Sequence, residues 1–227
     1  MKDRLKAIYD RIQTSARLCG RDPESVKLVA VSKTIGKDVV KQAIDAGVTI
    51  LGENYIQEAR AKINDLYESP VKWHFIGHLQ SNKAKYATRL FDLIHSVDSI
   101  KLAKAIDKSA AKTGRIQKIL VQVNISREAS KSGVDASKSL DLVRQIAKLP
   151  NVSVHGLMTM PPFFNSPERA RPYFKELKIL KERIRSENIA GVEMDELSMG
   201  MTGDFEVAIE EGATLVRIGT AIFGERK

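Results

Sequence analysis

Lys33 is the residue of this sequence whose type and position best suit covalent chemistry. It follows an apolar, β-branched run, Leu28–Ser32, that is typical of a parallel strand buried on both faces. An ammonium at the end of such a strand loses part of its hydration, which favours the neutral amine that forms Schiff bases with carbonyl compounds. The alternative is a lysine whose stem lies along the strand while its ammonium stays in water. Position alone leaves both interpretations open.

Two segments near the end of the chain have the composition of anion-binding loops. Ser198–Asp204 reads SMGMTGD and leads from a strand into a helix, and Arg217–Ala221 reads RIGTA and closes the last strand. Small residues let backbone N–H groups approach an anion, and the hydroxyls of Ser198 and Thr220 add donors. If the chain closes into a β/α-barrel, these are the loops that often bind phosphate, and Lys33 lies on the adjacent first strand. The combination predicts a pocket for a phosphorylated carbonyl compound.

Other chemistries find less support in the residue pattern. The histidines at 74, 78, 95 and 155 have no carboxylates at ligand spacing, and those at 74, 95 and 155 fall within strands. We therefore expect hydrogen-bonded interior histidines and no metal site. The Gly-x-Ser-x-Gly elbow of Ser-His-Asp hydrolases is absent. The single cysteine, Cys19, excludes an internal disulfide, and its place at a helix end predicts a packing thiol.

Eight apolar runs alternate with helical periodicity along the chain. The expected strands are Val26–Ser32, Val48–Gly52, Lys72–Gly77, Leu93–Val97, Ile116–Asn124, Val152–Met158, Met194–Met199 and Leu215–Ile218. The expected helices are Asp38–Ala46, Tyr55–Tyr67, Asn82–Leu90, Ser99–Thr113, Ala136–Leu149, Pro167–Glu187 and Gly203–Glu211.

This alternation predicts an α/β fold, a single (β/α)8 TIM-type barrel over residues 1–227. Too little chain follows the eighth strand for an outer helix. An N-terminal helix, with Leu5, Ile8, Ile12 and Leu18 on roughly one face, could fill that place in the ring. A doubly wound open sheet is the alternative. In a barrel, the polar residues at the strand exits would meet at one end: Lys33, Glu53, Asn54, His78, Asp98, Asn124, Thr159, Ser198, Arg217 and Thr220.

Composition is that of an ordinary globular protein. The chain has 227 residues, of which 43% are hydrophobic and 29% charged, with a net charge of +9. Its lysines are scattered along helical faces without interleaved aromatic residues, so solvated helix faces are favoured over a nucleic-acid patch. The amphipathic start of the chain is unlike a signal peptide, and no run has the length of a membrane span. We expect a cytosolic, cytoplasmic protein.

The motifs at the strand ends resemble those of the pyridoxal phosphate homeostasis proteins, also called PLP-binding proteins or the YggS/PROSC family. The similar segments are Val29–Thr34 (VAVSKT), Gly52–Glu58 (GENYIQE), Trp73–Lys83 (WHFIGHLQSNK), Leu197–Met201 (LSMGM) and Val216–Gly224 (VRIGTAIFG). The resemblance covers essentially the whole chain. It departs from the family at Ile35–Lys37, where a proline is often found.

The resemblance implies a barrel like the N-terminal domain of alanine racemase, with pyridoxal 5′-phosphate (PLP) bound to Lys33 as a Schiff base. It implies that Ser198, Met199, Gly219 and Thr220 surround the phosphate. It also implies that Arg217 approaches the pyridine nitrogen and that Asn54 lies beside the ring. A guanidinium does not give up its proton, so Arg217 would keep that nitrogen unprotonated and weaken the ring as an electron sink.

Two functions from different classes fit this resemblance. The first is a carrier that holds PLP for homeostasis, by buffering it or delivering it to apoenzymes, without turnover. The second is a PLP-dependent amino-acid racemase, which needs an acid or base on each face of the substrate α-carbon. In two-domain racemases the second group is a tyrosine from another domain, for which this chain has no room, although Tyr55 lies near a strand exit. The carrier is favoured, and a monomer is expected.

Overall fold

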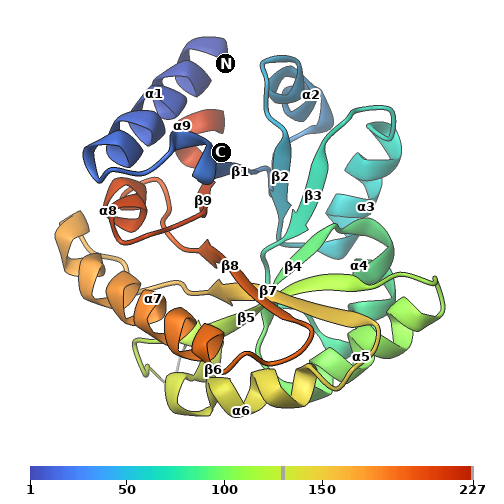
Figure 1. Ribbon diagram of the computed structural model, residues 1–227. Helices are drawn as coiled ribbons and strands as arrows, with labels where there is room; N and C mark the ends of the chain where they lie inside the picture. The colour runs from blue at the N-terminus through green and yellow to red at the C-terminus, as the bar shows by residue number, and fades with distance from the viewer. Residues whose placement is uncertain (129–130, 226–227) are drawn as a thin grey trace.

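A closed parallel barrel forms the centre of the protein (Figure 1). The computed structural model describes residues 1–128 and 131–225, and these contain nine strands. They are β1 (Lys27–Val31), β2 (Ile50–Glu53), β3 (Lys72–Phe75), β4 (Leu93–Val97), β5 (Gln117–Asn124), β6 (Val134–Asp135), β7 (Val152–Met158), β8 (Val192–Ser198) and β9 (Leu215–Ile218). The strand order is β4-β3-β2-β1-β9-β8-β7-β5, and pairing of β4 with β5 closes the ring.

The predicted eight-stranded barrel is therefore confirmed, and the open doubly wound sheet is wrong. One further strand, β6, was not predicted. Its two residues pair only with the end of β5, outside the ring. Such a short strand has no periodicity of its own to detect.

Helices surround the barrel and alternate with its strands (Figure 1). They are α1 (Lys2–Leu18), α2 (Lys37–Asp45), α3 (Ile56–Asp65), α4 (Ala84–Leu90), α5 (Ile100–Ala111), α6 (Ala136–Ile146), α7 (Arg171–Ser186), α8 (Phe205–Glu210) and α9 (Thr220–Phe223). Short 3-10 turns, η1 (Pro23–Ser25), η2 (Ser81–Lys83) and η3 (Pro167–Ala170), precede β1, α4 and α7. The expected helix from Pro167 thus begins as a 3-10 turn.

Two apolar cores hold these layers together. A small core fills the barrel interior with Val29, Ile50, Leu93, Leu120, Met158 and Leu215. A much larger one lies between the strands and the helices. Burying one aliphatic side chain of this size stabilises a fold by about 1.5–3 kcal/mol. The barrel therefore presents a rigid frame to the loops at its strand ends.

Helix α1 occupies the place in the ring that the short C-terminal segment leaves, as predicted, and packs on α8 and α9. Leu5, Ile8 and Ile12 are buried there. The prediction for Leu18 was wrong, because its side chain is 81% exposed. At 100° per residue, Leu18 lies about 110° from the centre of the buried stripe, on the flank of the helix.

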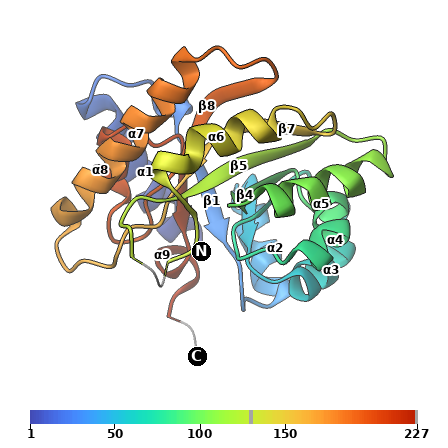
Figure 2. The same cartoon turned by 90° about the horizontal axis from the view of Figure 1, so that it is seen from below.

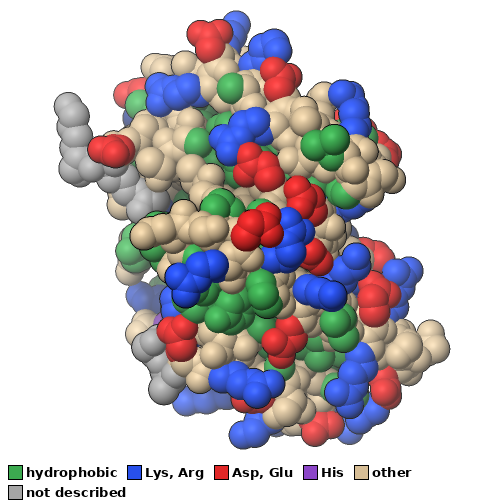
Figure 3. Space-filling model, turned by 90° about the vertical axis from the view of Figure 1, so that its left-hand side faces the viewer, with side chains coloured by type: hydrophobic (Ala, Val, Ile, Leu, Met, Phe, Trp, Pro, Cys, Tyr) green, Lys and Arg blue, Asp and Glu red, His purple; other side chains and the backbone are tan. Residues whose placement is uncertain are grey.

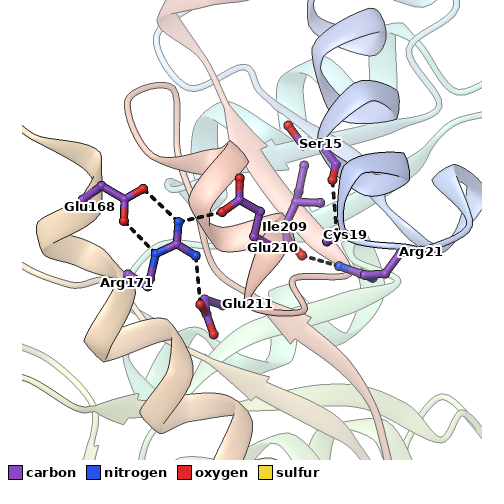
Figure 4. Close-up of polar contacts among 8 residues, drawn as sticks. All are labelled: Ser15, Cys19, Arg21, Glu168, Arg171, Ile209, Glu210 and Glu211. Atoms are coloured by element: carbon purple, nitrogen blue, oxygen red, sulfur yellow. Dashed lines mark hydrogen bonds and ion pairs between the residues drawn. The ribbon is translucent and has the colours of Figure 1, made fainter.

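The prediction of a packing thiol at Cys19 was also wrong. Cys19 is exposed, and its Sγ lies 3.2 Å from the carbonyl oxygens of Ser15 and Ala16 in the last turn of α1 (Figure 4). Cys19 is the C-cap of α1, and its thiol bonds locally to the last turn of that helix.

Helix α8 is fixed on both sides by arginines (Figure 4). Arg171 at the start of α7 bonds to Glu168 and to two carboxylates at the end of α8, Glu210 and Glu211. Arg21, after α1, donates from Nη1 to the carbonyl oxygen of Ile209 at 2.7 Å. Because α8 joins the loop after β8 to β9, these contacts hold in place two of the segments that line the site described below.

The outer surface carries charges of both signs. Figure 3 shows the face over α1, α8 and α7, where Lys and Arg side chains are interspersed with Asp and Glu. Several of these form ion pairs, such as Arg11 with Glu206 and Lys6 with Asp10. Among residues 1–128 and 131–225, no helix is both long enough and apolar enough to cross a membrane.

Candidate functional site

A cavity of about 260 Å³ opens at the carboxyl ends of the strands. Figure 2 shows α9, which follows β9 directly, at this end of the barrel, opposite the connection from α7 to β8. The cavity is lined by Val31, Lys33, Asn54, Ile76, Met160, Pro162, Phe163, Phe164, Met201, Thr202, Gly203, Asp204, Arg217, Gly219 and Thr220. They come from the ends of β1, β2, β3 and β9 and from the loops after β7 and β8. Two cationic side chains face one anionic one, which favours an anionic ligand.

Five of the seven site residues predicted from the sequence meet in this cavity. They are Lys33, Asn54, Arg217, Gly219 and Thr220. The pairing of β1 with β9 brings Lys33 close to Thr220, because Ala30 on β1 lies opposite Ile218 on β9. Strand alternation then points Lys33 and Asn54 into the barrel mouth, while their neighbours Ser32 and Glu53 contact Lys62 on α3.

The other two predicted residues, Ser198 and Met199, do not line the cavity. Ser198 is fully buried, and its hydroxyl lies inside the barrel between Arg217 and His95. Met199 is fully buried in the large outer core. Strand β8 ends at Ser198, and the loop lines the cavity from Met201 onward, so the role of Ser198 and Met199 at a phosphate stays a prediction.

Arg217 is held by two hydrogen bonds inside the barrel. Its Nη1 donates to Ser198 Oγ at 2.6 Å, and its Nη2 donates to the carbonyl oxygen of Thr159 at 2.9 Å. Burial lowers the pKa of Arg217 to about 10, and the nearby negative charge of Asp204 partly opposes this. The guanidinium thus remains charged at neutral pH and has one fixed orientation at the cavity wall.

A chain of hydrogen bonds continues from Arg217 across the barrel interior. Ser198 Oγ lies 2.8 Å from His95 Nδ1, and His95 Nε2 lies 3.0 Å from His74 Nδ1. Arginine can only donate, so Ser198 Oγ accepts from Arg217 Nη1. The two links that follow connect Arg217 through Ser198 and His95 to His74.

Both histidines in this chain are buried and neutral. Burial lowers the pKa of His74 to about 3, and it lowers the pKa of His95 well below the ordinary value. The nearby charges of Lys72 and Arg217, respectively, act in the same direction. The prediction of hydrogen-bonded interior histidines is confirmed for both. His155 is only partly buried and bonds to Ser153 and Glu193.

Asn54 brings an unused hydrogen-bond acceptor to the cavity. Its Oδ1 is buried and has no hydrogen-bond partner among the described residues. Such an atom costs about 1–3 kcal/mol unless a partner is supplied. Gly77 makes this placement possible, because a Cβ at that position would lie 2.4 Å from the carbonyl oxygen of Asn54. Asn54 therefore lines the cavity with one polar atom that the described residues leave without a partner.

The loop after β8, which the sequence predicted as an anion-binding segment, supplies four lining residues that were not among the seven predicted site residues: Met201, Thr202, Gly203 and Asp204. Gly200 starts this turn with φ +89°, and a Cβ there would lie 2.6 Å from Cβ of Ala208 on α8. Asp204 Oδ1 accepts from the Met201 N–H at 2.6 Å, which closes the turn. Burial raises the pKa of Asp204, against the effects of this hydrogen bond and of Arg217.

The loop after β7 was missed as well. Met160, Pro162, Phe163 and Phe164 form an apolar wall of the cavity. Phe164 stacks on Tyr173 of α7 at 5.7 Å, whereas Phe163 is 84% exposed. Large apolar side chains in a segment without strand or helix periodicity were the available signal, since such loops often carry function.

Comparison with known proteins agrees with this geometry. The profile of the alanine racemase N-terminal domain family matches residues 4–227. The pyridoxal phosphate homeostasis protein of Aquifex aeolicus is 44% identical over 226 residues, which cover 99% of this chain and 98% of that protein.

Two solved structures share the fold at substantial identity. An unknown protein from Bifidobacterium adolescentis is 37% identical, with a TM-score of 0.91 over 98% of this chain and 94% of that one. PipY of Synechococcus elongatus, solved with PLP bound, is 36% identical, with a TM-score of 0.83 over 96% of this chain and all of that one. The chain belongs to the family of pyridoxal phosphate homeostasis proteins, which is built on the alanine racemase N-terminal domain.

Proposed function

We propose that this protein binds PLP as a Schiff base of Lys33 and serves PLP homeostasis, as a single-domain monomer in the cytoplasm. One observation carries the proposal: the Lys33 amine and the buried Arg217 guanidinium line the same cavity at the strand ends. PLP carries an aldehyde for the first group and a ring nitrogen for the second, together with a phosphate. The homeostasis role is supported by the names of relatives and by PLP bound in PipY.

The residues present fit this cofactor. Asn54 offers a buried acceptor without a partner, which suits a ligand that carries a hydroxyl donor. Gly219 and Thr220 stand at the end of β9, where backbone amides and a hydroxyl suit a phosphate. Ser198 contributes by orienting Arg217 and Met199 by packing, so we assign neither side chain to the phosphate.

When bound, PLP supplies an electrophilic aldehyde and a ring that can withdraw electrons. Lys33 would hold PLP covalently through its amine, with the loss of one water. Arg217 would face the ring nitrogen and, because its guanidinium keeps its proton, would leave that nitrogen unprotonated.

The lining also favours a carrier over a racemase. Racemisation requires acid or base groups on both faces of the substrate carbon. Among the described lining residues only Lys33, Asp204 and Arg217 are titratable, and Asp204 is engaged by the Met201 N–H. Tyr55, which the sequence left as a candidate, is exposed and does not line the cavity.

Incubation of the PLP-loaded protein with a panel of L-amino acids is expected to give no sustained formation of D-enantiomers or keto acids. Chiral chromatography measures the first and a coupled dehydrogenase assay the second. The reason is the missing second acid or base described above. Sustained turnover of any amino acid would contradict the carrier function.

Delivery to apoenzymes separates a chaperone from a passive buffer. The loaded protein and a PLP-requiring apoenzyme are incubated together, or on two sides of a dialysis membrane that only PLP can cross. Faster activation in the mixed sample would support delivery by contact. Equal rates would support buffering, and no release on either side would contradict a homeostasis role.

Replacing Thr220 with valine is expected to weaken PLP retention by about 1–3 kcal/mol, because the hydroxyl donor is lost while the shape is kept. Equilibrium dialysis measures the change. Thr220→Ser keeps the hydroxyl and should bind as the unaltered protein does. Equal PLP affinity of the valine and serine variants would show that this hydroxyl does not contact the phosphate.

A further inference from the structure

We propose that Lys62 is a positioning residue for Lys33, acting through two carboxylates and the backbone on either side of Lys33. The proposal rests on the function proposed above, in which Lys33 forms the Schiff base. Lys62 lies on α3, outside the barrel, and does not line the cavity. Its effect on Lys33 therefore has to pass through other groups.

Lys62 is a buried ammonium with every donor in use. Its side chain is 6% exposed. Its Nζ donates to the carbonyl oxygen of Ser32 at 2.6 Å, to Glu53 Oε1 at 2.8 Å and to Glu58 Oε1 at 2.6 Å. An ammonium has three donors, so none remains. Lys62 thereby ties together the ends of β1 and β2 and the first turns of α3.

The residue before Lys33 is fixed at three atoms. Ser32 is fully buried, and its N–H donates to the carbonyl oxygen of Gly52 at 3.0 Å. Its Oγ donates to Glu53 Oε1 at 2.6 Å, and its carbonyl oxygen accepts from Lys62. The peptide that leads into Lys33 therefore has a single orientation.

The residue after Lys33 is held in an unusual conformation. Thr34 has φ +63°, in the left-handed region that β-branched residues rarely adopt. Its N–H donates to Glu58 Oε1 at 2.5 Å, the same oxygen that Lys62 binds. Strained backbone of this kind persists only where its surroundings fix it. Lys62 and Glu58, one helical turn apart, supply that constraint.

The cluster depends on Lys62 for its charge balance. Glu53 is fully buried, and its Oε2 has no partner among the described residues. Burial raises the pKa of Glu53, while the hydrogen bonds from Lys62 and Ser32 lower it. Apolar side chains often replace buried ion pairs without loss of stability, so stability alone does not explain this cluster. The backbone geometry that the cluster holds at Lys33 does explain it.

Holding both neighbours of Lys33 sets the direction in which its amine leaves the backbone. Bond formation with an aldehyde requires the nitrogen at the carbonyl carbon, and a misplacement of about 1 Å can cost 100-fold in rate. Ligand groups that bind Arg217 and Thr220 do not depend on this geometry. Loss of Lys62 should therefore slow Schiff-base formation without weakening non-covalent binding.

The test compares PLP with pyridoxine phosphate, which has an alcohol in place of the aldehyde. The variants are Lys62→Met and the double variant Lys62→Met/Glu53→Gln, which leaves no buried unpaired carboxylate if the single variant fails to fold. The control is Lys181→Met on α7, a lysine 9% exposed that pairs with Glu182. Stopped-flow absorbance follows the Schiff-base band, and calorimetry measures pyridoxine phosphate binding to the apoprotein.

We expect the Lys62 variants to form the Schiff base about 10- to 100-fold more slowly, with pyridoxine phosphate affinity unchanged within about twofold. Lys181→Met should match the unaltered protein in both measurements. An unchanged rate in folded Lys62 variants would overturn the proposal, and so would an equal loss of both ligands, which indicates a merely structural role. A band absent from the unaltered protein would contradict the function on which the proposal rests.

Discussion

Replacing Lys33 with alanine is expected to abolish the Schiff-base absorbance band that the protein develops with PLP. Within the described residues, Lys33 is the one lysine that lines the cavity. Alanine offers no nucleophile, and the remaining donors, including Arg217 and Thr220, support only non-covalent binding. An absorbance titration measures the band. Borohydride reduction followed by peptide mass spectrometry should place the trapped cofactor on the peptide that contains Lys33.

Lys37 provides a matched control for this experiment. It stands four residues further along, at the start of α2, where it is exposed and pairs with Asp65 at 3.0 Å. Lys37→Ala should leave the band intact because this side chain does not line the cavity. A band that survives in Lys33→Ala, or a trapped cofactor on any other lysine, would contradict the central assignment.

The fold was predictable because parallel strands carry their own signal. Strands such as β5 and β7 are covered on both faces, so apolar residues run through them with little interruption. Helical periodicity between the strands then leaves few topologies. Errors occurred where the packed face of a helix had to be assigned without knowing which element packs against it. Leu18 and Cys19, at the end of α1, were expected to pack, and both are exposed.

The site was predictable at strand ends and not in loops. Lys33, Asn54 and Arg217 reach the cavity because the register of parallel strands sets where their side chains point. Beyond the last ladder residue, direction depends on turns such as that at Gly200, which a linear pattern does not reveal. Ser198, the last residue of β8, bonds to Arg217 inside the barrel, and its predicted role at the phosphate stays a prediction.

Contacts that depend on long sequence separation could not be predicted at all. Lys62 lies 30 residues from Ser32, and its place in a helix pattern suggests an ordinary solvated lysine. The chain from Arg217 to His74 likewise joins four strands, and only closure of the barrel brings them together. Lys62 and the three residues that Arg217 is linked to in this chain lie behind the cavity lining, where motif spacing carries no information.

Acid is expected to destabilise the protein through the buried histidines, beginning near pH 6.5. The pKa of His74 is about 3 in the folded protein and near 6.5 when unfolded, so protons favour the unfolded chain. The stability that neutral His74 contributes is fully present above pH 6.5 and is lost as the pH falls toward 3. At about 1.4 kcal/mol per pH unit, His74 alone costs about 2 kcal/mol by pH 5. The lowered pKa of His95 acts in the same direction.

Urea unfolding of the apoprotein at pH 7.5 and pH 5 measures this loss. The double variant His74→Met/His95→Met has no buried imidazole to protonate, so the difference between its two free energies of unfolding should be smaller by at least about 2 kcal/mol. His78→Gln is the control, because His78 is exposed at the end of β3 and should leave the difference unchanged. If the double variant lost as much stability between the two pH values as the unaltered protein, the chain of neutral histidines behind Arg217 would be wrong.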